Sequence, residues 1–283
     1  MEIFNTSNEF LVWRNSLNDD LNVGFVPTMG AIHSGHLSLI KKSKMLCDVT
    51  VVSIFLNPRQ FSENEDLDLY PQDIENDKKQ LKSFGVDIVY LPSIDDVYSD
   101  DDFFVLKETK ISKNYEGKSR PVFFDGVITV VAKLFNLVQP TKSFFGKKDA
   151  QQLFLISKMV KHMKYPVEIV ACETIREHNG LAMSSRNRYF NNEQCGRASI
   201  IYDSLLLAKK LLGGGEKKIG EIKDRMTSLL SNNNIKIDYI SIVERENLNE
   251  VVQIGSNDVI VLLAVFLDGV RLIDNIYCSD VAG

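Results

Sequence analysis

The sequence predicts an α/β fold built on a doubly wound parallel sheet, followed by a smaller C-terminal α+β domain. Two observations support this prediction. In the first 175 residues short β-branched runs alternate with segments of helical period, whereas beyond residue 175 two long helical segments precede three strands. The chain has 283 residues, which is roughly twice the size of a typical domain, so two domains are expected.

Each expected strand of the first part is a short run rich in apolar and β-branched residues. The runs are Val23–Val26, Val49–Phe55, Asp87–Leu91, Ser143–Phe145 and Val167–Ala171. The helical segments between them are Leu37–Leu46, Ile74–Phe84, Gly126–Val138 and Ala150–Met163. Helices of this kind cover both faces of a parallel sheet, which makes the expected fold Rossmann-like. Ligands bind beyond the carboxyl ends of such strands, so function is expected in the loop after the first of them.

The pattern of the second part is different. A polar segment at 176–192 leads into helical segments at Asn192–Leu212 and Glu216–Leu230, which three consecutive glycines separate. The strands expected after them are Ile237–Val243, Val259–Leu267 and Gly269–Tyr277. Asp268-Gly269, between the last two runs, is a strong hairpin signal.

The composition argues against several classes of protein. The 33 basic and 38 acidic residues give a formal net charge of -5, the wrong sign for a protein that wraps nucleic acid. The longest strongly apolar run, Val259–Leu267, is far shorter than the roughly 20 residues of a membrane-spanning helix. The four cysteines are scattered, and the N-terminus lacks the features of a secretory signal. We therefore expect a cytoplasmic protein without disulfides, structural zinc or a membrane segment.

The loop at residues 27–36, after the first expected strand, carries the clearest chemical signal. It reads PTMGAIHSGH and runs directly into a helical segment. Gly30 and Gly35 let the backbone approach a ligand closely, and the N–H groups at a helix start favour an anion. His33 and His36 lie on one side of the first turn, so both can donate to the same phosphate or carboxylate oxygens. By itself such a pair is more often polar surface, and with a third ligand it could bind zinc.

A second loop, Gly146–Asp149, follows a short strand and opens the next helix. It can present backbone groups and the Lys148 side chain to a phosphate. The alternative is a capped helix start in which Asp149 is the early acidic residue, but this leaves the cation of Lys148 unexplained. Neither G-x-G-x-x-G nor G-x-x-x-x-G-K-[ST] occurs, so the common dinucleotide and P-loop signatures are absent from the sequence.

Several separated motifs resemble those of the pantoate–β-alanine ligase (pantothenate synthetase) family, within the H-x-G-H nucleotidyltransferase superfamily. The resemblance covers nearly the whole chain and depends on many sites rather than one. The matching segments are PTMGAIHSGH at 27–36, Ser53–Phe61, Asp66–Pro71, Glu116-Gly117 with Arg120-Pro121, Phe144–Asp149, Gln151-Gln152 and Gly180–Tyr189.

The resemblance implies an ATP-dependent ligase. In this family the carboxylate of (R)-pantoate attacks the α-phosphate of ATP and releases diphosphate, after which the amine of β-alanine displaces AMP from the pantoyl adenylate. The resemblance also implies Mg²⁺ on the ATP phosphates and a homodimer. In terms of domains, it implies that residues 1–175 bind ATP and pantoate, that 176–190 form a phosphate-binding hinge, and that 191–283 form a lid.

The resemblance also implies which residues bind ATP, since they occupy the positions that match the family motifs. The catalytic residues implied are His33, His36, Lys148, Ser184, Ser185 and Arg186. They are cations and hydrogen-bond donors, which suit the negative charge that develops when a carboxylate attacks a triphosphate. His36 corresponds to the family's proton donor, whereas His33 steadies the phosphates. The other ATP-binding positions are Met29, Gly30, Ala31, Ile32, Ser34, Gly35, Gly146, Lys147, Asp149, Ile175 and Met183.

Another set of positions corresponds to the family's substrate and metal residues. Gln60 and Gln152 match two glutamines that hold pantoate, and a neutral amide can bind hydroxyls and a carboxylate without quenching the nucleophile. The further substrate-side positions are Asn57, Tyr70, Glu116 and Arg120. The alternative for Glu116 and Arg120 is an ion pair with each other at the protein surface. Asp77 matches a family acid and is the candidate Mg²⁺ ligand.

Four positions depart from the family pattern, namely Phe123, Lys147, Ala150 and Asn179. They replace a His, a Glu, a Tyr and an Asp, and none removes a residue assigned to the chemistry. A nucleotidyltransferase of the same superfamily, acting on a phosphorylated substrate, is the alternative enzyme, but it has no need of the 57–61 segment or Gln152. A nucleotide-sensing module without turnover would not need the complete set of donors.

Overall fold

The computed structural model describes residues 1–63, 65, 67–216, 218–253 and 258–279. It divides the chain into two compact units. The large unit comprises Met1–Lys147 and Gln151–Glu173, and the small unit comprises Lys148–Ala150 and Thr174–Gly283. Within the described ranges, no helix is both long and apolar enough to cross a membrane.

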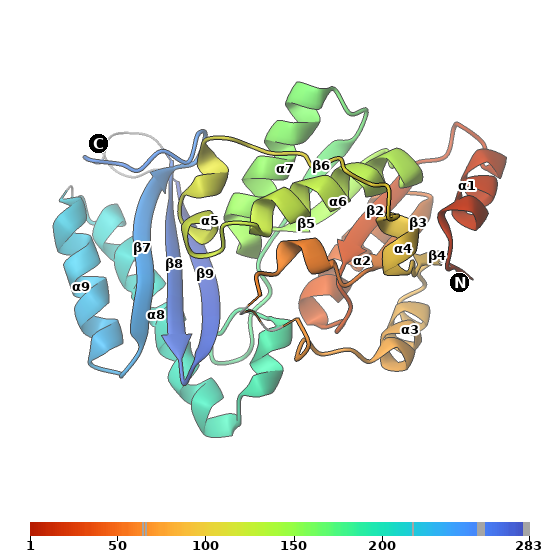
Figure 1. Cartoon of the computed structure of the whole chain (residues 1–283). Coiled ribbons are helices and arrows are strands. Elements are labelled where there is room, and N and C mark those ends of the chain that lie inside the picture. The colour runs from red at the N-terminus through yellow and green to blue at the C-terminus, as the bar shows by residue number, and fades with distance from the viewer. Residues whose placement is uncertain (64, 66, 217, 254–257, 280–283) are drawn as a thin grey trace. The chain divides into compact units, whose positions relative to one another are not determined.

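The large unit is built on a parallel sheet of six strands in the order β1-β4-β3-β2-β5-β6 (Figure 1). The strands are β1 (Glu2–Phe4), β2 (Val23–Thr28), β3 (Val49–Ile54), β4 (Ile88–Tyr90), β5 (Lys142–Gly146) and β6 (Glu168–Cys172). The five strands expected in this part are confirmed to within a few residues. β1 was not expected, because three residues are too few to show a period.

Helices of the large unit occupy the connections between strands. They are α1 (Ser7–Ser16), α2 (Ser34–Leu46), α3 (Ile74–Ser83), α4 (Ile94–Val97), α5 (Glu116–Ser119), α6 (Phe123–Val138) and α7 (Ala150–Met163). Short 3₁₀ turns lie at η1 (Pro58–Gln60), η2 (Ile111–Lys113) and η3 (Lys147–Asp149). The four expected helices correspond to α2, α3, α6 and α7. α2 begins three residues earlier than expected, because His33 rather than a hydroxyl or carboxylate side chain caps it.

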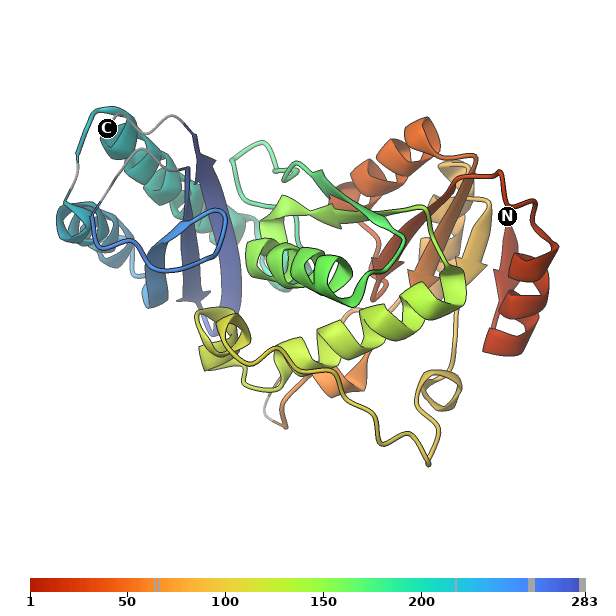
Figure 2. The same ribbon diagram turned by 90° about the horizontal axis from the view of Figure 1, so that it is seen from above.

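Neighbouring residues of the central strand pack on opposite faces of the sheet. Val26 belongs to a buried cluster with Ile40 of α2, whereas the ring of Phe25 lies 6.4 Å from the ring of Phe135 of α6. Figure 2 shows α2 and α6 on the two sides of the sheet. Since successive strand residues point to opposite faces, an uninterrupted apolar strand requires helices on both sides. The doubly wound, Rossmann-like prediction is therefore confirmed.

The strand order indicates which end of the sheet binds a ligand. From β2 the chain adds β3 and β4 on one side, and β5 and β6 on the other. The direction of winding therefore switches between β2 and β5. In sheets of this type ligands bind outside the carboxyl ends of the strands at the switch point. The loops after β2 and β5 are those that the sequence analysis singled out.

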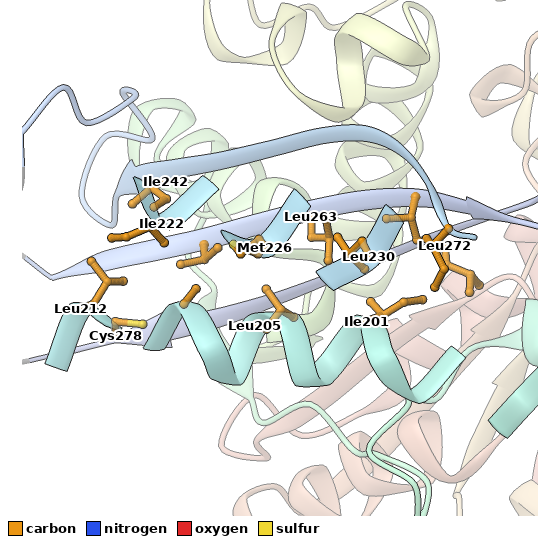
Figure 3. Packing of buried hydrophobic residues seen from close by; sticks show 14 of the residues in the cluster. Ile201, Leu205, Leu212, Ile222, Met226, Leu230, Ile242, Leu263, Leu272 and Cys278 are labelled. Carbon is orange, nitrogen blue, oxygen red and sulfur yellow. The ribbon is translucent and has the colours of Figure 1, made fainter. Parts of the chain in front are cut away.

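The small unit is an antiparallel sheet covered by helices. Its main elements are η4 (Ser185–Tyr189), α8 (Asn192–Gly213), α9 (Ile219–Ser231), β7 (Lys236–Glu244), β8 (Val259–Leu267) and β9 (Val270–Cys278). The strands follow the order β7-β8-β9, and Asp268 and Gly269 both have positive φ (48° and 85°), as a tight two-residue hairpin requires. Leu205, Met226 and Leu263 illustrate the core, in which α8 and α9 pack on the sheet (Figure 3). The expected α+β architecture is confirmed.

Leu205→Ala is expected to lower the free energy of unfolding by about 2–5 kcal/mol, because it removes a fully buried side chain and leaves a cavity. Leu205 is 0% exposed, whereas its neighbour Leu206 is 41% exposed. Leu206→Ala is therefore the matched control, with an expected change below about 1 kcal/mol. Urea denaturation followed by circular dichroism measures both. Equal losses in the two variants would contradict the packing described for α8.

Candidate active site

The loop between β2 and α2, here called the histidine loop (residues 29–36), combines an unusual backbone with a helix start. Gly30 and Ala31 both lie in the left-handed region, with φ of 87° and 51°. A Cβ on Gly30 would lie 3.1 Å from Asp77 Oδ2 and 3.2 Å from Ile54 Cγ2, so glycine allows these groups to approach. The backbone reverses here and delivers His33 to the N-terminus of α2. This end of a helix favours an anion.

The two histidines of this loop have distinguishable environments. Nδ1 of His33 accepts the backbone N–H of Gly35 at 3.1 Å and so caps α2. In neutral His33 this hydrogen bond places the proton on Nε2. The ring of His36 stacks on that of His33, with centroids 4.0 Å apart and planes at 27°.

Asp77 of α3 is bound to the backbone of the histidine loop. Its Oδ2 accepts the N–H of Ala31 at 2.9 Å and its Oδ1 accepts the N–H of Ile32 at 2.8 Å. Gln80, one turn further along α3, donates its Nε2 to the carbonyl of Ile32 at 3.3 Å. Asp77 is 0% exposed. The candidate metal ligand thus faces adjacent main-chain N–H groups.

Gln60 lies beside the histidine loop and is held by Asn57. The amide of Asn57 donates to Gln60 Oε1 at 3.2 Å and to the carbonyl of Gly126 at 3.1 Å, and both side chains are buried. Gln60 Nε2 in turn contacts Met29 Sδ at 2.8 Å. Asn57 is therefore occupied in orienting Gln60, and Gln60 presents its amide next to Met29.

Tyr98, which the sequence analysis did not single out, completes this arrangement. Its hydroxyl donates to Asn57 Oδ1 at 3.0 Å, and the guanidinium of Arg59 lies 3.9 Å from its ring centroid. Burial raises the pKa of Tyr98 to about 12, so the hydroxyl remains a donor at neutral pH. No sequence motif could have identified Tyr98, because it lies 41 residues from Asn57 in a segment without a recognisable pattern.

Arg120 connects the Gln60 segment to a neighbouring acid. Its guanidinium binds both oxygens of Glu65, at 2.5 and 2.9 Å, and donates to the carbonyl of Gln60 at 3.2 Å. The ring of Phe123, one of the departures from the family pattern, lies 3.8 Å from the guanidinium carbon. Arg120 is buried and pairs with Glu65, so it is not an exposed surface cation. Phe123 therefore packs on the guanidinium of this ion pair.

The remaining substrate-side residues differ in their surroundings. Tyr70 is buried against Phe61, with ring centroids 6.1 Å apart. Asp66, in the same motif, lies outside the described residues. Glu116 is buried, and its backbone N–H donates to Gln151 Oε1 at 3.1 Å. Gln151 also donates to two backbone carbonyls and is thus a structural residue, whereas Gln152, next along α7, is half-buried.

The small unit contains the second set of predicted donors. Lys148 Nζ lies 3.2 Å from Asp149 Oδ1, and the Lys148 carbonyl accepts Nδ2 of Asn275 at 2.6 Å. Ser184 caps η4 by accepting the N–H of Arg186 at 3.3 Å. The backbone N–H of Met183 donates to the carbonyl of Ile175 at 2.9 Å. The predicted ATP-side residues of this unit therefore lie on backbone turns with defined hydrogen bonds.

An ion pair between half-buried Arg176 and buried Asp274 supports the 176–190 segment. The guanidinium of Arg176 binds both oxygens of Asp274, at 2.6 and 3.0 Å, and donates to the carbonyl of Gly180 at 3.0 Å. It also stacks on the Tyr202 ring at 3.7 Å. Burial raises the pKa of the Asp274 carboxyl, and the Arg176 hydrogen bonds oppose that shift. The members of this pair lie 98 residues apart, so no local motif could have predicted it.

The other departures from the family pattern are accommodated locally. Asn179 donates to the carbonyl of Cys195 at 2.8 Å and accepts the N–H of Leu181 at 3.1 Å. An ionised aspartate could accept in this turn but could not donate. Lys147 pairs with Glu173, and Ala150 is buried.

The sheet order and the histidine loop define the class of this protein. It is a doubly wound α/β protein with backbone donors and imidazoles at its switch point, an arrangement suited to phosphate. The family model for Pantoate-beta-alanine ligase matches residues 2–277. The chain therefore belongs to the pantoate–β-alanine ligase family, which confirms the resemblance seen in its motifs.

Individual relatives agree with this assignment. The chain is 48% identical over 262 residues to the pantothenate synthetase of Thermosipho africanus, covering 93% of this chain and 94% of that protein. The pantothenate synthetase structure from Thermus thermophilus has a TM-score of 0.90 and 37% identity, with 98% and 99% of the two chains covered. The Francisella tularensis pantoate-beta-alanine ligase, in complex with beta-gamma ATP and beta-alanine, has a TM-score of 0.82, 35% identity, and coverage of 98% and 97%.

Proposed function

We propose that this chain condenses (R)-pantoate with β-alanine to give (R)-pantothenate, with ATP converted to AMP and diphosphate through a pantoyl adenylate. The observation that carries the proposal is the position of Gln60, whose amide contacts Met29 of the histidine loop at 2.8 Å. An amide beside a phosphate-binding loop can hold a hydroxy acid next to the phosphate that it attacks. A nucleotidyltransferase that acts on a phosphorylated substrate has no need of this amide.

In the first step a pantoate carboxylate oxygen forms a bond to the α-phosphorus of ATP, while the bond from that phosphorus to the bridging oxygen of the diphosphate breaks. His33, with its proton on Nε2, donates to the phosphates. His36 stacks on His33 and supplies the proton donor of the pair. Lys148, Ser184, Ser185 and Arg186 stabilise the developing charge.

In the second step the neutral amine of β-alanine attacks the carbonyl carbon of the adenylate, the bond from that carbon to the phosphate oxygen of AMP breaks, and the nitrogen loses one proton to solvent. Gln60 and Gln152 keep the pantoyl group in place, while Asn57 orients Gln60. Arg120 holds the carbonyl of Gln60 and so fixes the same segment. We assign Tyr70 and Glu116 to the lining of this substrate region, where both are buried.

Magnesium is part of the proposal as a companion of the ATP phosphates, whose charge it neutralises. Within the described residues no three His, Cys, Asp or Glu side chains group to hold a metal, so no site made of protein ligands alone is formed there. The two oxygens of Asp77 accept backbone N–H groups. Every step above is therefore assigned to groups of the chain and the substrates.

The roles of the regions belong to the proposal as well. Residues 1–175 bind ATP and pantoate, 176–190 carry phosphate donors as a hinge, and 191–283 act as a lid that excludes water from the adenylate. The Arg176–Asp274 pair supports this role of the hinge, because it anchors one end of the segment. Protection of 176–190 from hydrogen exchange by ATP tests the assignment. Unchanged exchange would contradict it.

We further propose a cytoplasmic homodimer. The four cysteines are free, which agrees with a reducing compartment. Phe103 and Phe104 are 84% and 85% exposed, and adjacent exposed aromatic rings are typical of interfaces. Sedimentation velocity tests the dimer, and a monomer at micromolar concentration would contradict it.

The proposed reaction is tested with purified protein, ATP, Mg²⁺, pantoate and β-alanine. AMP is expected only when both organic substrates are present, and pantoate alone is expected to support exchange of diphosphate into ATP. Exchange without pantoate, or turnover of a phosphorylated substrate in its place, would favour the nucleotidyltransferase alternative. A protein that binds ATP but forms no product would favour a sensing module.

A further inference from the structure

The histidine loop is bound to α3 by a carboxylate that matches two backbone N–H groups. Ala31 and Ile32 offer two adjacent N–H groups, and the two oxygens of Asp77 accept one each, at 2.9 and 2.8 Å. A carboxylate is the side chain that presents two acceptors and no hydrogen. An amide of the same size would have to turn an NH₂ group toward one of the two donors.

The residues around this contact are arranged to allow it. Ala31 has a φ of 51°, a conformation that residues other than glycine rarely adopt and that persists only where the surroundings impose it. A Cβ on Gly30 would lie 3.1 Å from Asp77 Oδ2, tighter than most real contacts. Gln80 holds the carbonyl of Ile32 from the same helix. α3 therefore binds both N–H and C=O of the residue that precedes His33.

We propose that Asp77 is a positioning residue that fixes the backbone of the histidine loop so that His33 and the start of α2 face the triphosphate, and that it does not ligate Mg²⁺. The proposal deepens the proposed function, since it concerns how the same loop binds ATP. It assigns Asp77 an action through the loop backbone rather than through contact with ATP.

The test compares ATP binding with and without metal. Isothermal titration calorimetry of the full chain with ATP in excess EDTA measures the binding of ATP in the absence of Mg²⁺. Asp77→Asn is expected to raise the metal-free Kd at least tenfold, and to raise the KM for ATP at saturating Mg²⁺ by a similar factor. The Mg²⁺ concentration that gives half-maximal activity at saturating ATP is expected to stay within twofold.

Asp73→Asn is the matched control. Asp73 caps the same helix by accepting the N–H of Asn76 at 3.1 Å, and asparagine caps helices equally well. Its ATP binding is expected to equal that of the wild type. A metal ligand would behave in the opposite way to the proposal: unchanged metal-free binding in Asp77→Asn, with a much higher Mg²⁺ requirement, would overturn it.

A second variant keeps the test informative if Asp77→Asn does not fold. Gln80→Leu removes the donor to the Ile32 carbonyl from a half-buried position and leaves Asp77 intact. It is expected to raise the metal-free Kd for ATP about threefold to tenfold, and an unchanged Kd would overturn the proposal. The binding measurement needs no turnover, so an inactive wild type that still binds ATP would contradict the proposed function alone.

Discussion

Truncation of Lys148 or His36 to alanine is expected to lower kcat by roughly a hundredfold or more, because each removes a preorganised donor directed at the charge that develops on the phosphates. The main chain of Lys148 is expected to stay in place, since its carbonyl is held by Asn275 at 2.6 Å rather than by its own side chain. Formation of AMP at saturating ATP, pantoate and β-alanine measures the effect. Thermal melting of both variants checks that the fold is retained.

Lys161→Ala is a suitable control for the loss of a cation. Lys161 lies on the exposed part of α7, away from the loops assigned to phosphate. Its kcat is expected to match that of the wild type. Near wild-type rates in both Lys148→Ala and His36→Ala would instead contradict the assignment of the two loops to ATP.

Gly126→Ala is expected to destabilise the protein by about 2 kcal/mol or more and to raise the KM for pantoate. A Cβ at Gly126 would lie 2.3 Å from the carbonyl oxygen of Arg59 and 2.7 Å from the backbone nitrogen of Gln60. These are main-chain atoms that no rotamer change can move. α6 and η1 must therefore separate, which displaces Gln60. Urea denaturation and steady-state kinetics measure the two effects.

Gly196→Ala provides the reverse result. Gly196 lies within α8, and a Cβ there would have nothing within 4 Å. Since glycine costs more conformational entropy than alanine in a helix, this variant is expected to be more stable by about 0.5–1 kcal/mol. A loss of stability in Gly196→Ala as large as that in Gly126→Ala would contradict the assignment of the Gly126 effect to the contact with the 59–60 peptide.

Much of the fold could be predicted from the sequence because its strands and helices are long and patterned. The exceptions are short or polar. β1 has three residues, and α4 and α5 have four each. α1 was missed although the signal was present, since Thr6 and Glu9 form a capping box just before Phe10 and Leu11. Reading that motif would have identified the helix.

The candidate site was predictable in its residue types but not in its contacts. The motifs that resemble the family supplied the histidines, the glutamines and Lys148. The partners that hold them lie far along the chain: Asp77 is 46 residues from Ala31, and Asn275 is 127 residues from Lys148. Secondary-structure propensity and hydrophobic periodicity describe only neighbouring residues, so they cannot predict pairs that tertiary folding brings together.

Because Lys148–Ala150 belong to the small unit, this unit cannot be expressed or exchanged as one continuous C-terminal fragment. These three residues are flanked on both sides by chain of the large unit, so an independently expressed fragment from Thr174 onward would lack Lys148. Chimeras that exchange such a fragment between relatives would join Asn275 of one parent to a lysine of the other. Exchange of the complete small unit therefore requires a second exchanged segment at residues 148–150.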